Sequence, residues 1–283
     1  MRKGSEPFLF MKIVAICFAL TCGLVAPQGF AQSNDENSLS RAELNRGVEA
    51  YKSGHYAEAV QHFEQALKLD PENQNAELYL GTAYLIQWVP GADSAANAQN
   101  YDLAQRHFKA VLAKDARNEL ALAMLASMAY NSAMARTGEE RTAALQEAKR
   151  WNERRIEVNP RDGEPYYYIG VIDWATSFTH VSRARTEAKM KPSDRRPLDD
   201  SAVRKQLHAQ YADIVQEGLS NLEKCLAIDH ENEDAMSYVN LLLRVKATLE
   251  DDAGAAQTDY AQADVWATKA IETKKKKAAG VQQ

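Results

Sequence analysis

The chain has 283 residues, of which 45% are hydrophobic and 26% are charged, and its formal net charge is −5 at pH 7. This negative charge argues against a general nucleic-acid binder, because proteins of that class are normally basic. Glycine (13) and proline (8) are sparse, and this composition favours helix almost throughout.

Residues 1–31 have the composition of a signal peptide. Basic residues precede an apolar run from Ile13 to Ala26, and Gly29-Phe30-Ala31 then offers small residues at the positions that a signal peptidase reads. The apolar run has 14 residues, which is too short to span a bilayer. We therefore expect a bacterial protein that is exported, periplasmic or secreted, with a mature chain that begins near Gln32.

Some features of this segment stay open. Translation begins at Met1 or at Met11, and a buried N-terminal helix is the alternative to a signal peptide. A lipoprotein anchor at Cys22 is disfavoured, because Ala19-Leu20-Thr21 lacks a small residue directly before the cysteine. Cleavage would leave Cys225 as the one cysteine, so the exported chain would have no intramolecular disulfide.

From residue 40 onward the chain repeats a pattern of small and apolar residues. In the first copy, Gly47 precedes Ala59 by 12 residues, Phe63 follows four residues later, and Asp70-Pro71 ends one helix and starts the next. Small residues let two helices approach closely, and Phe63 lies on the same helix face as Ala59. The pattern recurs at later positions, where the second helix carries its small residue at Ala104, Ala148, Gly218 and Ala263.

This pattern resembles the tetratricopeptide repeat family over roughly residues 40–275. The first copy is the closest, with Gly47, Tyr51, Gly54, Tyr56, Ala59, Phe63, Ala66 and Pro71 all in register. The resemblance implies an all-α fold, a solenoid of about five helix pairs that binds protein partners and is not an enzyme. The expected copies are residues 40–73, 74–118, 119–162, 163–232 and 233–275, between a disordered linker (32–39) and a disordered tail (276–283).

The later copies are longer than the first. The distance between the small residues of the two helices rises from 12 residues in the first copy to 23, 22, 48 and 23, so the extra residues fall inside each pair. We expect a loop at residues 87–94 and a helical hairpin at about 175–212, with Asp200-Ser201 as the N-cap of its return helix. The two halves of this hairpin are expected mainly to cover each other. Its basic stretch, Arg183 to Lys205, is either a docking site for an acidic partner or lipid headgroups, or a solvated face.

No motif for catalysis, cofactor binding or metal binding is present. His55 and His62 are predicted not to form a metal site, and the acidic residues 229–234 lack the glycine and the closing glutamate of a calcium loop. Cys225 is predicted to be a buried, unreactive thiol. We expect neither cofactor nor metal.

The flanks of the first helices of the pairs are rich in aromatic residues, which favour binding hot spots. The alternative is that several of these side chains pack internally against the inserted segments. A peptide's terminal carboxylate is not the expected ligand, because Leu44, Val48 and Tyr79 replace the Lys/Asn clamp of some family members. Two rival functions stay open, an outer-membrane-associated scaffold docked through the hairpin and an accessory subunit of an enzyme complex. The expected partner-binding residues are Tyr51, Leu78, Tyr79, Leu85, Tyr130, Tyr167, Tyr168, Val171, Trp174 and Tyr238.

Overall fold

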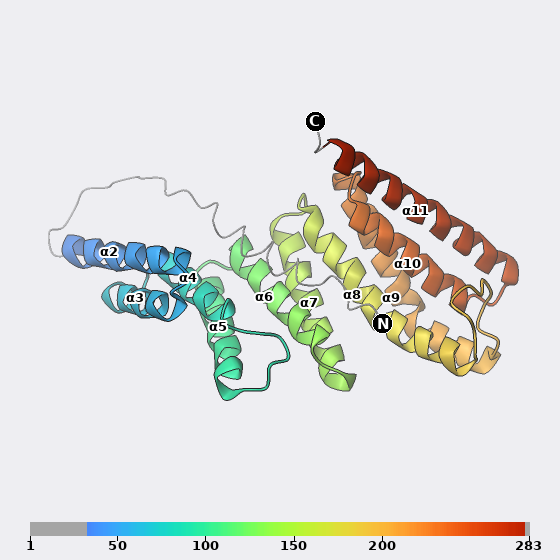
Figure 1. Ribbon diagram of the computed structural model, residues 1–283, viewed down its shortest axis with the longest axis horizontal. Coiled ribbons are helices and arrows are strands. Elements are labelled where there is room, and N and C mark those ends of the chain that lie inside the picture. Colours follow the sequence, from blue (N-terminus) through green and yellow to red (C-terminus); the bar gives the residue numbers. More distant parts are fainter. Residues whose placement is uncertain (1–32, 281–283) are drawn as a thin grey trace. The chain divides into compact units, whose positions relative to one another are not determined.

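The expected helices occupy nearly all of the chain that the computed structural model describes, residues 33–280. The expected signal peptide, residues 1–31, lies outside the described residues. Within residues 33–280 there are ten helices and no strand, so the prediction of an all-α fold is confirmed (Figure 1). The helices are α2 (Ser33–Lys52), α3 (Tyr56–Leu69), α4 (Gln74–Leu85), α5 (Ala95–Lys114), α6 (Glu119–Met134), α7 (Gly138–Val158), α8 (Gly163–Glu187), α9 (Ser201–Ile228), α10 (Glu233–Leu249) and α11 (Ala253–Gly280).

The described residues divide into two compact units, and the boundary falls between Ala144 and Leu145, within α7. We call them the N-terminal unit and the C-terminal unit. This boundary lies inside the expected third copy, residues 119–162, because α6 belongs to the first unit and most of α7 to the second.

In the N-terminal unit, a glycine of the first helix of a pair lies against a phenylalanine of the second. A Cβ atom added to Gly47 of α2 would lie 2.4 Å from Phe63 of α3, and one added to Gly81 of α4 would lie 2.9 Å from Phe108 of α5. Both phenylalanines are fully buried. The predicted close approach at small residues is therefore confirmed in both pairs.

The C-terminal unit repeats this contact with leucine in place of phenylalanine. A Cβ atom added to Gly170 of α8 would lie 2.4 Å from Leu222 of α9, and one added to Gly218 of α9 would lie 2.8 Å from Leu242 of α10. Leu222, Leu242 and the thiol of Cys225 are fully buried in one hydrophobic cluster. Helices α8 to α11 thus pack around a continuous core.

The turns between successive pairs share one hydrogen-bonded design. A first Asp or Asn accepts a hydrogen bond from the backbone N–H two residues later, and a second one, three residues after the first, caps the next helix. Pro71 lies within such a turn and α4 begins only at Gln74, so the prediction that this proline starts the helix was wrong. The residue pairs are Asp70 and Asn73, Asp115 and Asn118, Asn159 and Asp162, and Asp229 and Asn232.

The connections inside the pairs vary in length. Residues 86–94 form the expected loop, whereas the extra residues of the third and fifth copies lengthen the helices themselves. Asp200 caps α9 as predicted, because its side chain accepts hydrogen bonds from the N–H groups of Ala202 and Val203. Residues 188–200 connect α8 to α9 and form the tip of the predicted hairpin.

The two halves of this hairpin pack against α10 as well as against each other. Met190 and Leu198 are buried in the core of the C-terminal unit together with Leu243, Val245 and other residues of α10. The backbone N–H of Leu198 donates to the carbonyl oxygen of Thr248 at 3.0 Å. The expectation of a self-contained hairpin was therefore wrong, and the insertion forms part of the core.

The segments expected to be disordered are helical within the described residues. Helix α2 begins at Ser33, and α11 continues to Gly280. Near that end, Lys276 lies 3.0 Å from Glu231, and Lys277 lies 2.6 Å from Glu233 at the start of α10. These ion pairs hold the last turns of α11 against the neighbouring helix.

Candidate functional site

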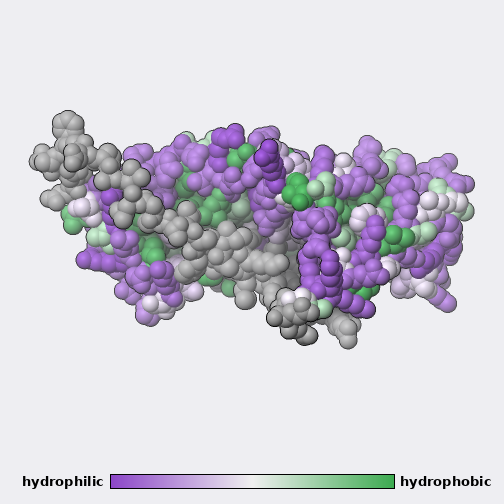
Figure 2. All heavy atoms as spheres, turned by 90° about the horizontal axis from the view of Figure 1, so that it is seen from above, coloured by the Kyte–Doolittle hydropathy of each residue, from purple (hydrophilic) through white to green (hydrophobic). Residues whose placement is uncertain are grey.

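Six of the ten predicted binding residues are buried within their own unit. On the face shown in Figure 2, hydrophilic side chains (purple) predominate, and hydrophobic ones (green) appear in small separate patches. The alternative of internal packing therefore describes most of the predicted residues better. The buried ones, with at most 9% of their surface exposed, are Tyr51, Leu78, Leu85, Tyr130, Tyr168 and Val171.

The other predicted residues are only partly buried. Tyr79 belongs to the N-terminal unit, where its ring stacks on Phe63 at 5.5 Å between centroids. Tyr167, Trp174 and Tyr238 lie in the C-terminal unit, and their rings contact one another. The structure therefore brings together three of the ten predicted residues as an aromatic group that is partly accessible.

Phe178 extends this aromatic group along α8. Its ring stacks on Trp174, with 4.9 Å between centroids, and 40% of its surface is exposed. Trp174 in turn contacts Tyr238 of α10 at 5.4 Å. The aromatic surface, defined as Tyr167, Trp174, Phe178 and Tyr238, thus joins the first helices of the fourth and fifth pairs.

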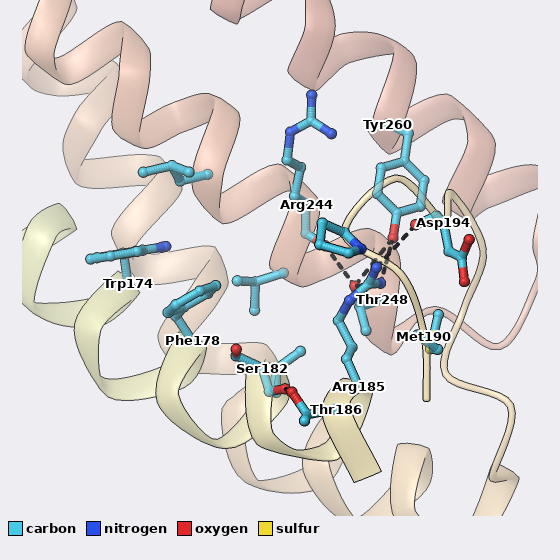
Figure 3. Close-up of a pocket in the computed structure, with 14 residues that line it drawn as sticks. Trp174, Phe178, Ser182, Arg185, Thr186, Met190, Asp194, Arg244, Thr248 and Tyr260 are labelled. Atoms are coloured by element: carbon cyan, nitrogen blue, oxygen red, sulfur yellow. Dashed lines mark hydrogen bonds between the residues drawn. The ribbon is translucent and has the colours of Figure 1, made fainter. Parts of the chain in front are cut away.

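A pocket of about 300 Å³ adjoins this surface in the C-terminal unit (Figure 3). Trp174 and Phe178 form one side, and Arg185, Arg244 and Tyr260 lie on the other. Helices α8 and α10, the start of α11 and the hairpin tip all contribute to the wall. The remaining lining residues are Val181, Ser182, Thr186, Met190, Pro192, Asp194, Leu241, Val245 and Thr248.

Arg185 connects the hairpin tip to α10 and α11 at one end of the pocket. Its guanidinium donates to the hydroxyl oxygens of Thr248 and Tyr260, each at 3.3 Å. It also donates to the carbonyl oxygens of Lys191 and Asp194, at 3.0 and 3.1 Å. These bonds fix the shape of the pocket end that the insertion supplies.

The sequence did not predict the pocket, and Phe178, Arg185, Arg244 and Tyr260 were not among the expected binding residues. A signal was present on α8, where Trp174, Phe178 and Arg185 are spaced by four and seven residues and therefore share one helix face. The contribution of α10 and α11 depends on contacts more than 60 residues apart, which that spacing does not reveal.

The basic hairpin stretch is largely engaged within the molecule. Arg204 pairs with Asp251 at 3.1 Å, and Arg183 pairs with Glu187 at 2.9 Å. Arg195 pairs with Asp264 of α11. These pairs reduce the net positive charge that the stretch presents to a partner or to lipid.

A buried charged group lies near the middle of α8. Asp173 is almost fully buried, and its Oδ1 lies 2.8 Å from Nζ of Lys149, which also lies 2.8 Å from Glu217. The other oxygen of Asp173, Oδ2, has no hydrogen-bond partner within the described residues. Burial raises the pKa of Asp173 to about 7, because it disfavours the charged form, although Lys149 opposes the shift.

The single cysteine of the described residues behaves as predicted. Cys225 is buried in the core and forms no disulfide. Burial raises the pKa of its thiol to about 11, so the reactive thiolate is disfavoured at neutral pH.

Residues 33–280 contain neither a metal-binding cluster nor a membrane-spanning helix. This range has no group of three His, Cys, Asp or Glu side chains suited to hold a metal ion. None of its helices is both long and apolar enough to cross a membrane.

Comparison with known proteins finds a family match in one part of the chain. Residues 40–73 match the tetratricopeptide repeat family, the range expected for the first copy. No curated protein sequence matches the chain.

Solved structures with a similar fold include several of MamA. A crystal structure of MamA protein is 16% identical, with 86% of this chain and 95% of that chain covered and a TM-score of 0.50. MamA from Desulfovibrio magneticus RS-1, residues 41 to the end, is 14% identical, with 86% and 97% covered and a TM-score of 0.51. At this identity the likeness concerns the fold alone, and it covers most of both chains.

Proposed function

We propose that this chain is a tetratricopeptide repeat protein that acts as a non-enzymatic scaffold and binds a protein partner through an extended peptide segment. The observation that carries the proposal is the aromatic surface of the C-terminal unit. Trp174 and Phe178 of α8 and Tyr238 of α10 form contiguous ring contacts, and Phe178 is substantially exposed. Aromatic residues of this kind dominate the binding energy of protein interfaces.

The proposed contact region is narrower than the one expected from sequence. It is limited to the aromatic surface and the adjoining pocket, because most of the other predicted residues are buried. We also propose that the protein acts outside the cytoplasm, because residues 1–31 have the composition of a signal peptide.

Site-specific photo-crosslinking of the full chain tests the proposed surface. A photoreactive amino acid replaces Phe178 in one variant and Val265 of α11 in the control, where 54% of the side chain is exposed. Crosslinks to a discrete protein from position 178, and none to it from position 265, would support the proposal. Equal crosslinking at both positions, or none at either, would count against it.

Export is tested separately by fractionation and N-terminal sequencing. A mature chain that begins near Gln32 in the periplasm or the medium supports export. An intact N-terminus in the cytoplasm contradicts it.

A further inference from the structure

We infer that the pocket beside the aromatic surface is a specificity pocket for an acidic peptide, which inserts a large apolar side chain and places a carboxylate against Arg185. This inference rests on the proposed function and narrows the class of partner. The inserted hairpin is what creates the pocket, because Met190, Pro192 and Asp194 of its tip form part of the wall.

The pocket offers an apolar wall to a side chain. Trp174, Phe178 and Val181 come from α8, and Leu241 and Val245 come from α10. A volume of about 300 Å³ is at the lower end of the usual range for small-molecule sites. One large apolar side chain therefore suits the space better than a cofactor would.

An unsatisfied donor lies at the aromatic side of the pocket. The indole Nε1 of Trp174 is buried and has no hydrogen-bond partner within the described residues. An indole nitrogen only donates, and a buried donor without an acceptor costs free energy. Because this N–H is shielded from solvent, its NMR signal reports on a ligand that packs against the Trp174 ring.

The charge at the other end favours an anionic ligand. Arg185 donates only to neutral oxygen atoms, and no carboxylate among residues 33–280 forms an ion pair with it. Arg244 and Arg195 nearby share one carboxylate, that of Asp264. The charged residues that line the pocket are Arg185, Arg244 and Asp194, so two guanidinium groups face one carboxylate, in a chain whose net charge is −5.

The distance between the two ends sets the length of the ligand. Trp174 and Arg185 are 11 residues apart on α8, which corresponds to about 16 Å along the helix. An extended peptide covers that span in about five residues. An apolar residue and an acidic residue two or three positions apart lie about 7–10 Å apart along an extended backbone, and their side chains reach over the remaining distance.

The test uses synthetic peptides and the full chain. The probe is acetyl-Gly-Phe-Ser-Glu-Glu-Gly-amide, and its two matched controls replace both Glu by Gln or the Phe by Ala. Binding is followed by the NMR signal of the Trp174 indole N–H, assigned with Trp174→Phe. We expect the Phe-to-Ala peptide to bind at least ~10-fold more weakly and the Gln peptide at least ~5-fold more weakly at low salt.

Protein variants separate the pocket from general charge effects. Phe178→Ala removes an exposed ring and should weaken the probe at least ~5-fold without unfolding the protein. Arg185→Gln should abolish the preference for Glu over Gln peptides. Arg183→Gln is its matched control, because this exposed arginine of the same helix pairs with Glu187 and does not line the pocket.

Each outcome decides the inference. Dependence on both Phe and Glu, with a shifted Trp174 signal, supports it, and the preference for Glu must disappear in a folded Arg185→Gln protein. Equal binding of the Glu and Gln peptides overturns it, as does binding to phosphatidylglycerol vesicles without binding to the peptide. If no peptide binds but position 178 still crosslinks a protein, this inference fails and the proposed scaffold function stands.

Discussion

The N-terminal and C-terminal units use the same close helix contact but differ in what surrounds it. In the N-terminal unit the glycines lie against Phe63 and Phe108, and Trp88 is the one buried hydrophobic residue of the loop at residues 86–94. In the C-terminal unit the glycines lie against leucines, and the connection at residues 188–200 contributes Met190 and Leu198 to the core. The close contact at a glycine therefore defines the fold of a helix pair, whereas the segment that connects its two helices decides whether the pair also forms a pocket.

The two units also differ in the polar side chains that they pair. His62 lies 2.7 Å from Glu43, and His107 lies 2.6 Å from Glu77, at corresponding positions of the first two pairs. The C-terminal unit instead buries the carboxylates of Asp173 and Asp259 against lysines. These differences between the two units can be tested by their effects on stability.

Replacement of Lys189–Asp199 by a Gly-Ser linker should destabilise the C-terminal unit by about 4 kcal/mol or more, because it removes two buried side chains, Met190 and Leu198. Urea unfolding followed by far-UV circular dichroism measures the loss. The same replacement of Val89–Asp93 in the N-terminal unit is the control and should cost less than about 1 kcal/mol, since Val89 is exposed. Equal losses would show that the two connections do not differ.

Gly47→Ala and Gly170→Ala should each destabilise the protein by about 1–3 kcal/mol, because the added Cβ would lie 2.4 Å from Phe63 or Leu222. Gly163→Ala is the matched control on α8, where the nearest atom would lie at an ordinary 3.5 Å. Chemical unfolding of the three variants gives the comparison. A loss confined to one unit would mean that the glycine contact is not equivalent in the two.

Asp173→Asn should change how stability depends on pH. The pKa of Asp173 is raised to about 7 in the folded state, from an ordinary value of 3.8, so the folded protein binds this proton more tightly than the unfolded chain. Its contribution is present at low pH and is lost as pH rises from about 4 to 7, by an amount of the order of 2 kcal/mol. The free energy of unfolding of the wild type, relative to Asp173→Asn, should therefore fall over this range.

Asp102→Asn, at an exposed position of the N-terminal unit, controls for the loss of one negative charge. A constant difference between wild type and Asp173→Asn across the range would contradict the assigned shift.

The smallest expected effect concerns Glu43. Its hydrogen bond with His62 lowers the pKa of Glu43 below 4.5, so the bond stabilises the folded state above that pH and is lost as pH falls through the lowered value. His62→Ala should reduce stability slightly at pH 6 and not at pH 3. Unfolding curves at the two pH values check this, and an equal loss at both would assign the effect to packing.

The repeat pattern predicted the helix pairs, because small residues at Gly47 and Ala59 and their later counterparts must lie where helices touch. The turns were predicted less well, because Pro71 predicts a helix start three residues before the observed start of α4. The Asp/Asn spacing is the feature that all four turns share. The binding site was predicted least well. Burial of Tyr51 or Tyr168 depends on residues distant in sequence, and the helical spacing of one element does not report what covers it.

Within each unit, the turns between helix pairs have a constant design, whereas the connections inside the pairs vary in length. In the turns, an Asp or Asn spaced three residues from a second one fixes the geometry, so a length change there would misplace every later pair. Inside the pairs, insertions of 10 to 36 residues relative to the first copy have been accommodated. Within each unit, a segment inside a pair can therefore be gained or lost without a change in the register of the helix pairs, and such a segment can add a binding feature.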